Sequence, residues 1–184
     1  MSKNWLYLLL ISGFIAGCQS ETKTKGAAVQ VNDSYQSKGF SIADSGLYYY
    51  VTVKNPWQNA TNTYYYYKLS KTEKNINGAI QIPVKKVVCR STTHVGFIGQ
   101  LNETGSIIGL SNPGLINNPE VRKGIESGLI TDIGYDAALN FELLLQLKPD
   151  VVFAYSVGPE MAPLQTKLAE FGIPLVMVAE YLEE

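Results

Sequence analysis

Apolar and polar residues divide the start of the chain into two stretches. An apolar run over residues 5–16 follows one basic residue, Lys3, and a polar stretch rich in Thr, Lys, Gln and Ser then continues to residue 38. The run is too short for a membrane-spanning helix, which needs about 20 apolar residues. A basic residue, an apolar segment and small residues, in that order, are typical of a secretory signal peptide. We therefore predict a signal peptide over residues 1–17.

Residues 39–83 have the composition of β structure, with many Tyr, Val and Thr residues. Turn residues such as Gly46 and the Asn55-Pro56 pair separate the predicted strands. The predicted strands cover residues 40–42, 47–53 and 63–69. Two tyrosine clusters lie in this segment. They are read either as a surface for carbohydrate or aromatic ligands or as cross-strand contacts between paired strands, and we favour the second reading.

From residue 84 onward, short apolar strands alternate with segments of helical spacing. The predicted strands cover residues 86–90, 106–110, 151–155 and 175–178, and the predicted helices cover residues 93–101, 119–127, 140–147 and 159–171. Strands that are apolar on both faces and alternate with helices indicate a parallel sheet flanked by helices. We therefore predict an α/β fold over residues 84–184, preceded by the β-rich segment.

In sheets of this kind, ligands bind beyond the carboxyl ends of the strands. The loops at residues 91–94, 111–114 and 156–160 each follow a predicted strand. Topology alone therefore makes these loops the candidate binding rim.

Composition excludes several function classes. The formal net charge is −1, which is typical neither of a nucleic-acid-binding protein nor of a polybasic membrane patch. The single histidine excludes a metal site built from several histidines, so we expect no resident metal or cofactor. We expect no enzyme, because no nucleophile motif accompanies the acidic residues Asp132, Asp136 and Glu142. Cys89 lies in an apolar strand and is expected to be a buried thiol.

The end of the apolar run, Ile15-Ala16-Gly17-Cys18, resembles the lipobox of bacterial lipoproteins. That resemblance implies that Cys18 is acylated and becomes the mature N-terminus, with residues 18–38 as a flexible tether. The implied location is the periplasm or the cell surface, with a lipid anchor in a bacterial membrane. A plain signal peptide or a membrane-anchoring helix is the alternative.

Residues 140–152, Asn-Phe-Glu-Leu-Leu-Leu-Gln-Leu-Lys-Pro-Asp-Val-Val, resemble the N-L-E-x-I-x-x-L-K-P-D-L-V block of one protein family. That family comprises the substrate-binding proteins of ABC importers for iron-siderophore complexes, haem and vitamin B12. Residues 90–94 and 107–110 occupy the places of its first two strands and their loops, and residues 171–175 match its L-G-I-P-V segment. The β-rich segment is similar to that of lipoprotein members from the Bacteroidota.

The resemblance implies one Rossmann-like lobe of a two-lobed binding protein whose lobes are joined by a long helix. The chain ends at Glu184, near the expected start of that helix, so we expect only the first lobe in residues 84–184. Members of the family bind ligands and are not enzymes. The implied ligand is an iron chelate such as a siderophore complex, haem or a corrinoid such as cobalamin. The implied partners are an ABC permease and its ATPase.

The resemblance also assigns roles to individual residues. Glu142 matches the glutamate that docks into an arginine pocket of the permease. Read from its position alone, it is a carboxylate stabilised by a helix dipole. Tyr135 and Tyr155 fall near aromatic contacts of the vitamin B12-binding relative, and aromatic walls suit flat macrocycles and catecholates.

The predicted rim loops add Thr92, Thr93, His94, Ser111 and Asn112 as candidate ligand contacts. The simpler reading of Thr92 and Thr93 is that they cap the next helix. The simpler reading of His94 is a structural hydrogen bond.

Three other function classes stay open. The first is a haem or siderophore scavenger that acts without a permease, and the second is a structural surface lipoprotein. The third is a metal-cluster-associated protein, because nitrogenase components resemble the same two-lobed architecture. The absence of cysteines other than Cys89 from the predicted sheet domain argues against this third class.

Overall fold

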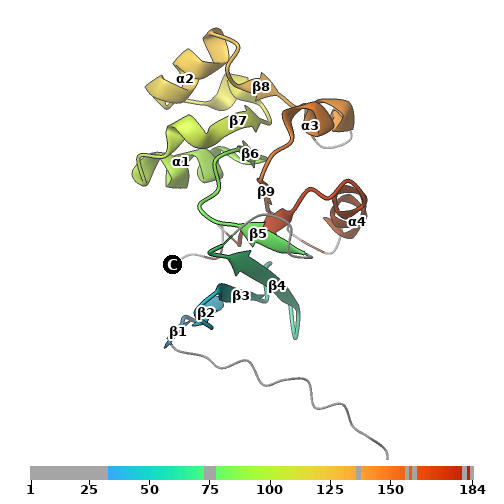
Figure 1. Ribbon diagram of the computed structural model, residues 1–184. Helices are drawn as coiled ribbons and strands as arrows, with labels where there is room; N and C mark the ends of the chain where they lie inside the picture. Colours follow the sequence, from blue (N-terminus) through green and yellow to red (C-terminus); the bar gives the residue numbers. More distant parts are fainter. Residues whose placement is uncertain are drawn as a thin grey trace, which may run out of the picture.

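The computed structural model describes residues 33–72, 78–135, 138–155, 158, 161–179 and 182. The predicted signal peptide and Cys18 lie outside these residues. The described chain forms two five-stranded sheets, one of which carries all the α-helices (Figure 1). Among the described residues, no helix combines the length and the apolar composition that are needed to cross a bilayer.

The first sheet has the order β1-β2-β3-β4-β5. Its strands are β1 (Asp33–Gln36), β2 (Phe40–Asp44), β3 (Tyr48–Lys54), β4 (Tyr64–Ser70) and β5 (Ala79–Gln81). Strands β1 to β4 pair antiparallel, whereas β5 pairs parallel with β4. The three strands predicted for this segment are confirmed.

The tyrosines of β4 alternate between the two faces of this sheet, as strand geometry requires. The rings of Tyr64 and Tyr66 lie 6.3 Å apart on one face, and those of Tyr65 and Tyr67 lie 6.5 Å apart on the other. Tyr65 and Tyr67 pack against the cores of the second sheet. The strands pair as expected, but β4 tyrosines lie opposite non-aromatic residues such as Val51 and Val53, and the ring contacts of Tyr64–Tyr67 run along β4 rather than between strands.

Strand β1 corrects the predicted extent of the tether. Residues 33–38 were expected to belong to a flexible segment because they are polar, yet Asp33–Gln36 pairs with β2. The ring of Tyr35 lies 5.6 Å from that of Phe40 on the neighbouring strand. The hydrogen bonds that stabilise β1 come from its partner strand, so the composition of β1 alone does not reveal it.

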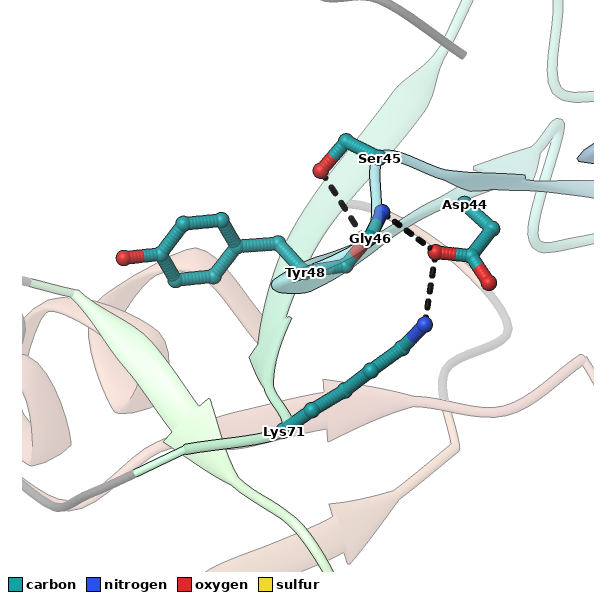
Figure 2. A network of polar contacts seen from close by, with 5 residues as sticks. All are labelled: Asp44, Ser45, Gly46, Tyr48 and Lys71. Carbon is teal, nitrogen blue, oxygen red and sulfur yellow. Dashed lines mark hydrogen bonds and ion pairs between the residues drawn. The ribbon is translucent and has the colours of Figure 1, made fainter. Parts of the chain in front are cut away.

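A polar network closes the turn between β2 and β3 (Figure 2). The carboxylate of Asp44 accepts a hydrogen bond from the backbone amide of Gly46 at 2.7 Å and from the ammonium of Lys71 at 2.6 Å. The backbone amide and the hydroxyl of Ser45 both donate to the carbonyl oxygen of Tyr48. Lys71 thereby ties the end of β4 to the turn.

This network predicts a pH-dependent contribution to stability. The hydrogen bonds from Lys71 and Gly46 hold the pKa of Asp44 below its ordinary value of 3.8. A carboxyl group with a lowered folded-state pKa stabilises the fold above its ordinary pKa, and this contribution is lost as the pH falls through the folded-state value. Asp44→Asn should therefore lower the free energy of unfolding at pH 7, and the difference from the wild type should shrink below about pH 4.

Urea unfolding at pH 7 and at pH 3 measures this difference. Lys71→Met should lower stability in the same way at pH 7, because it removes the main cause of the pKa shift. A difference between wild type and Asp44→Asn that stays constant over this pH range would contradict the prediction.

The second sheet is entirely parallel and has the order β10-β9-β6-β7-β8. Its strands are β6 (Val87–Cys89), β7 (Ile107–Leu110), β8 (Thr131–Asp132), β9 (Val151–Ala154) and β10 (Leu175–Met177). Its helices are α1 (Thr92–Gln100), α2 (Pro119–Glu126), α3 (Phe141–Leu147) and α4 (Ala162–Glu170), with short 3₁₀ turns η1 (Thr104–Ser106) and η2 (Pro113–Leu115). The predicted α/β class, a parallel sheet flanked by helices, is confirmed.

Each face of this sheet has its own core. Val87 and Cys89 point toward the core formed with α1 and α2, whereas Val88 points toward the core formed with α3 and α4. Figure 1 shows the two pairs of helices on opposite sides of the sheet. Cys89 is fully buried, as predicted.

The two sheets also contact each other. The backbone amide of Met177 on β10 donates to the hydroxyl oxygen of Tyr67 on β4 at 2.8 Å. Burial raises the pKa of the Tyr67 phenol above its usual range. Tyr67 therefore links the β-rich segment to the edge of the parallel sheet.

Candidate functional site

The strand order of the parallel sheet reverses next to β6. The chain proceeds from β6 through β7 to β8 on one side and then returns to β9 and β10 on the other. Loops that follow β6 and β9 therefore lead in opposite directions, and such a point at the carboxyl ends of the strands is where open α/β sheets bind ligands. The backbone amide of Arg90, directly after β6, donates to the carbonyl oxygen of Phe153 on β9 at 3.0 Å.

Two of the predicted ligand contacts meet at this edge. Tyr135 lies in the loop after β8, Tyr155 follows β9, and their hydroxyl oxygens are 3.5 Å apart. Tyr135 is 41% exposed. Ser111 follows β7, and its hydroxyl donates to the carbonyl oxygen of Gly134 at 2.7 Å. The structure thus brings Tyr135 and Tyr155 together from two loops, and the buried Ser111 holds the loop that carries Tyr135.

The predicted ligand contacts in the loop after β6 differ in their exposure to solvent. Thr92 and Thr93 are exposed in the first turn of α1. The cap of this helix is Ser91, whose hydroxyl oxygen accepts from the amide of Thr93 at 3.1 Å, so the expectation that a threonine caps it is wrong. His94 is only 2% exposed, and its ring lies 6.0 Å from that of Phe153.

Asn112 follows Ser111 in the loop after β7. It is half-buried and adopts a left-handed backbone conformation with a φ of 53°. Asparagine tolerates this conformation better than most residues, so the backbone conformation alone explains why an asparagine occupies this position.

A cavity of about 350 Å³ lies where this edge meets α3 and α4. Its lining residues are Arg90, Leu139, Phe141, Met161, Pro163, Leu164 and Lys167. None of these side chains is predicted from the sequence to contact a ligand. One signal was present: Arg90 is a charged residue directly after a fully buried strand.

Glu142 occupies the first turn of α3 and is exposed. The helix begins as predicted, because the side-chain oxygen of Asn140 accepts from the amide of Leu143 at 3.0 Å. A carboxylate at this end of a helix is stabilised by the helix dipole. Its exposure leaves the carboxylate accessible to a partner.

Metal-ligating side chains do not cluster in the described chain. No group of three or more His, Cys, Asp or Glu residues within those ranges is arranged to hold a metal ion.

No known protein-family model matches the chain. Two curated proteins are similar to it in sequence, both uncharacterized lipoproteins of Methanocaldococcus jannaschii. The first is 30% identical over 111 residues, which cover 56% of this chain and 26% of the relative. The second is 25% identical over 206 residues, which cover 100% of this chain and 52% of the relative. The chain thus spans about half or less of the length of these relatives.

Among solved structures, an iron uptake ABC transporter substrate-binding protein from Streptococcus pneumoniae is similar to this chain, with 20% sequence identity and a TM-score of 0.42. The match covers 62% of this chain and 34% of that protein. A petrobactin-binding protein from Bacillus subtilis is 18% identical, with a TM-score of 0.41. That match covers 70% of this chain and 37% of the petrobactin-binding protein. A periplasmic haem-binding protein from Pseudomonas aeruginosa is also 18% identical, with a TM-score of 0.41. That match covers 51% of this chain and 31% of the haem-binding protein.

Proposed function

We propose that this chain carries the ligand-binding edge of a substrate-binding lipoprotein that delivers an iron complex or a corrinoid to an ABC importer. The observation that carries the proposal is the Tyr135–Tyr155 pair at the carboxyl edge, beside the reversal of strand order. The resemblance of residues 140–152 to the binding-protein block supports it. The description of both sequence relatives as lipoproteins supports acylation at Cys18.

In this proposal, residues 1–17 are a signal peptide, Cys18 bears the lipid, and residues 84–184 form the first of two lobes. The lipid anchor keeps the binding protein close to the permease and its ATPase. Glu142 is the contact with the permease, and the protein binds its ligand without chemical conversion.

The two tyrosines suit a flat or polycyclic ligand. Aromatic side chains bury a large apolar area at a small cost in side-chain entropy, and their hydroxyls keep a polar function at the rim. Thr92, Thr93 and Asn112 supply polar groups around the same edge. Ser111 is buried and its hydroxyl donates to Gly134, so its proposed contribution is to fix the loop that carries Tyr135. His94 is buried, so its proposed contribution is to support the loop rather than to contact the ligand directly.

The test is titration of the full chain with haem, a ferric siderophore and cobalamin, followed by absorbance and by protein fluorescence. For the ligand that binds, Tyr155→Ala and Tyr135→Ala should each weaken binding by about tenfold, which corresponds to about 1.4 kcal/mol. The matched control is Tyr66→Ala, because Tyr66 is 74% exposed on the first sheet. Equal effects of all three substitutions would contradict the assignment of the site.

A permease-independent scavenger is the second candidate, and the same pair of an exposed and a half-buried tyrosine supports it. It differs only in the role of Glu142, which the Glu142→Arg variant tests.

A further inference from the structure

The face of the first sheet that points away from the parallel sheet is rich in tyrosine. Tyr65 and Tyr67 pack against the cores of the parallel sheet, so the alternation of side chains along β4 places Tyr64 and Tyr66 on the opposite face. Residues that pair across β3 and β4 share a face, and the register therefore extends this surface onto β3. We call it the tyrosine face, and its positions on β3 and β4 are Tyr48, Tyr50, Thr52, Lys54, Tyr64, Tyr66, Lys68 and Ser70.

The four tyrosines of this face form a diagonal stripe across the two strands. Tyr66 pairs with Thr52, which makes Tyr50 its diagonal neighbour on β3. Ring centres lie 6.3 Å apart within the tyrosine pair of each strand. The stripe follows β3 from Tyr48 to Lys54, a length of about 20 Å at the rise of a strand. A row of rings of this length fits an extended polymer better than a compact molecule.

The packing of the fold does not account for these rings. Tyr66 is 74% exposed and Tyr64 is 45% exposed. Their ring contact runs along β4, so it does not join β4 to its neighbour. Large side chains that remain in water and adjoin one another mark interaction surfaces, whereas single exposed ones do not. The tyrosine face therefore has the character of a binding surface.

Two lysines flank the stripe on its two sides. Lys54 lies opposite Tyr64, and Lys68 lies opposite Tyr50. The ammonium of Lys68 lies 3.9 Å from the centre of the Tyr48 ring, and this cation–π contact keeps the charge beside the stripe. Among the positions of β1 to β4 that share this face, none is acidic. The face is thus positively charged, although the whole chain has a net charge of −1.

Rings and cations together favour an acidic polysaccharide. The C–H face of a sugar ring packs on an aromatic side chain, while the phenol hydroxyl bonds to sugar hydroxyls. Carboxylates of uronic acid units accept charge-assisted hydrogen bonds from ammonium groups. A polyanion without sugar rings would leave the stripe uncovered. Single-stranded nucleic acids also stack on aromatic rings, but the proteins that bind them do so through strongly basic grooves rather than a face with two lysines.

We infer that the tyrosine face binds a linear acidic polysaccharide, with sugar rings packed along the stripe and carboxylates bound by Lys54 and Lys68. The face points away from the parallel sheet, whose carboxyl edge carries Tyr135 and Tyr155. The inference goes beyond the proposed function and does not rest on it. It gives the β-rich segment a role of its own, which is attachment to a polymer.

The experiment compares polymers that differ in charge and in the presence of sugar rings. The full chain is titrated by calorimetry with polygalacturonate and alginate, which are acidic glycans, and with dextran, polyglutamate and an oligothymidylate. We expect at least one acidic glycan to bind at least about tenfold more tightly than each of the other three polymers. Equal binding of polyglutamate would mean attraction by charge alone, and tightest binding of oligothymidylate would mean a nucleic-acid surface. Either result overturns the inference, as does dextran that binds equally well or the absence of binding to both acidic glycans.

The double substitution Tyr64→Ala/Tyr66→Ala should weaken binding of the acidic glycan at least about tenfold. Both side chains are exposed, so the variant should fold normally, and a thermal melt checks this. The matched control is Tyr35→Ala, because Tyr35 is 59% exposed but its register in the sheet places it on the opposite face. Equal losses in the variant and the control would overturn the assignment of the surface.

The double substitution Lys54→Met/Lys68→Met should remove most of the preference for the acidic glycan over dextran. The matched control is Lys123→Met/Lys167→Met, which removes the same charge from exposed positions on α2 and α4. The control should keep the full preference. An equal loss in the control would assign the preference to the net charge of the chain and overturn the inference.

Discussion

Replacement of Glu142 by arginine is expected to reduce ligand uptake by cells at least about tenfold and to leave ligand binding unchanged. Loss of one partner of a close charged pair at a protein interface costs about 2–5 kcal/mol, and reversal of the charge adds repulsion. Glu142 is exposed in the first turn of α3, so the arginine side chain meets no packing constraint. Uptake of radiolabelled iron complex and ligand titration of the purified variant measure the two effects.

Glu120→Arg is the matched control for this substitution. Glu120 occupies the same second position of α2 as Glu142 does of α3, and it is also exposed. Both substitutions place a cation near a helix N-terminus, which costs helix stability. Glu120→Arg also removes the hydrogen bond that the Thr104 hydroxyl donates to Glu120 at 2.7 Å, so it is a stringent control for destabilisation. Normal uptake by the Glu142→Arg variant would exclude the docking role and favour a scavenger that acts without a permease. Equal losses in both variants would assign the effect to helix destabilisation.

Leu144→Ala is expected to lower the free energy of unfolding by about 2–5 kcal/mol. Leu144 is 0% exposed and belongs to the core that α3 and α4 form with the sheet. Truncation of its side chain removes buried methyl groups and leaves a cavity that the neighbouring side chains fill only in part. Urea denaturation followed by circular dichroism measures the loss.

The neighbouring Leu145 provides the control, because it lies on the same helix but is substantially exposed. Leu145→Ala should change the stability by less than about 0.5 kcal/mol. Similar losses for the two substitutions would mean that α3 does not pack on the sheet as described.

Most elements of the parallel sheet could be predicted from sequence because each carries its own signal. Apolar runs identify β6 and β9, and capping asparagines mark the starts of α2 and α3. Strands β1, β5 and β8 were not predicted individually. They are short, and pairing with a neighbouring strand, rather than their own composition, stabilises them.

The candidate site could be predicted only in part. The family resemblance pointed to Tyr135 and Tyr155, and the structure brings them together. The cavity was missed because it depends on tertiary contacts between Arg90 and residues of α3 and α4 that are distant in sequence. Lys167 looks like an ordinary surface lysine until its position over Phe141 is known.

Nuclear magnetic resonance with isotope-labelled tyrosines locates the bound ligand on the protein. A paramagnetic ferric ligand broadens the signals of nearby rings, so its binding position can be mapped without any substitution. We expect ferric haem or a ferric siderophore to broaden the Tyr135 and Tyr155 signals and to leave those of Tyr64 and Tyr66 sharp. Broadening centred on Tyr64 and Tyr66 would contradict a ligand-binding site at the carboxyl edge of the parallel sheet. So would the absence of broadening with every ferric complex, if cobalamin also leaves the Tyr135 and Tyr155 signals unshifted.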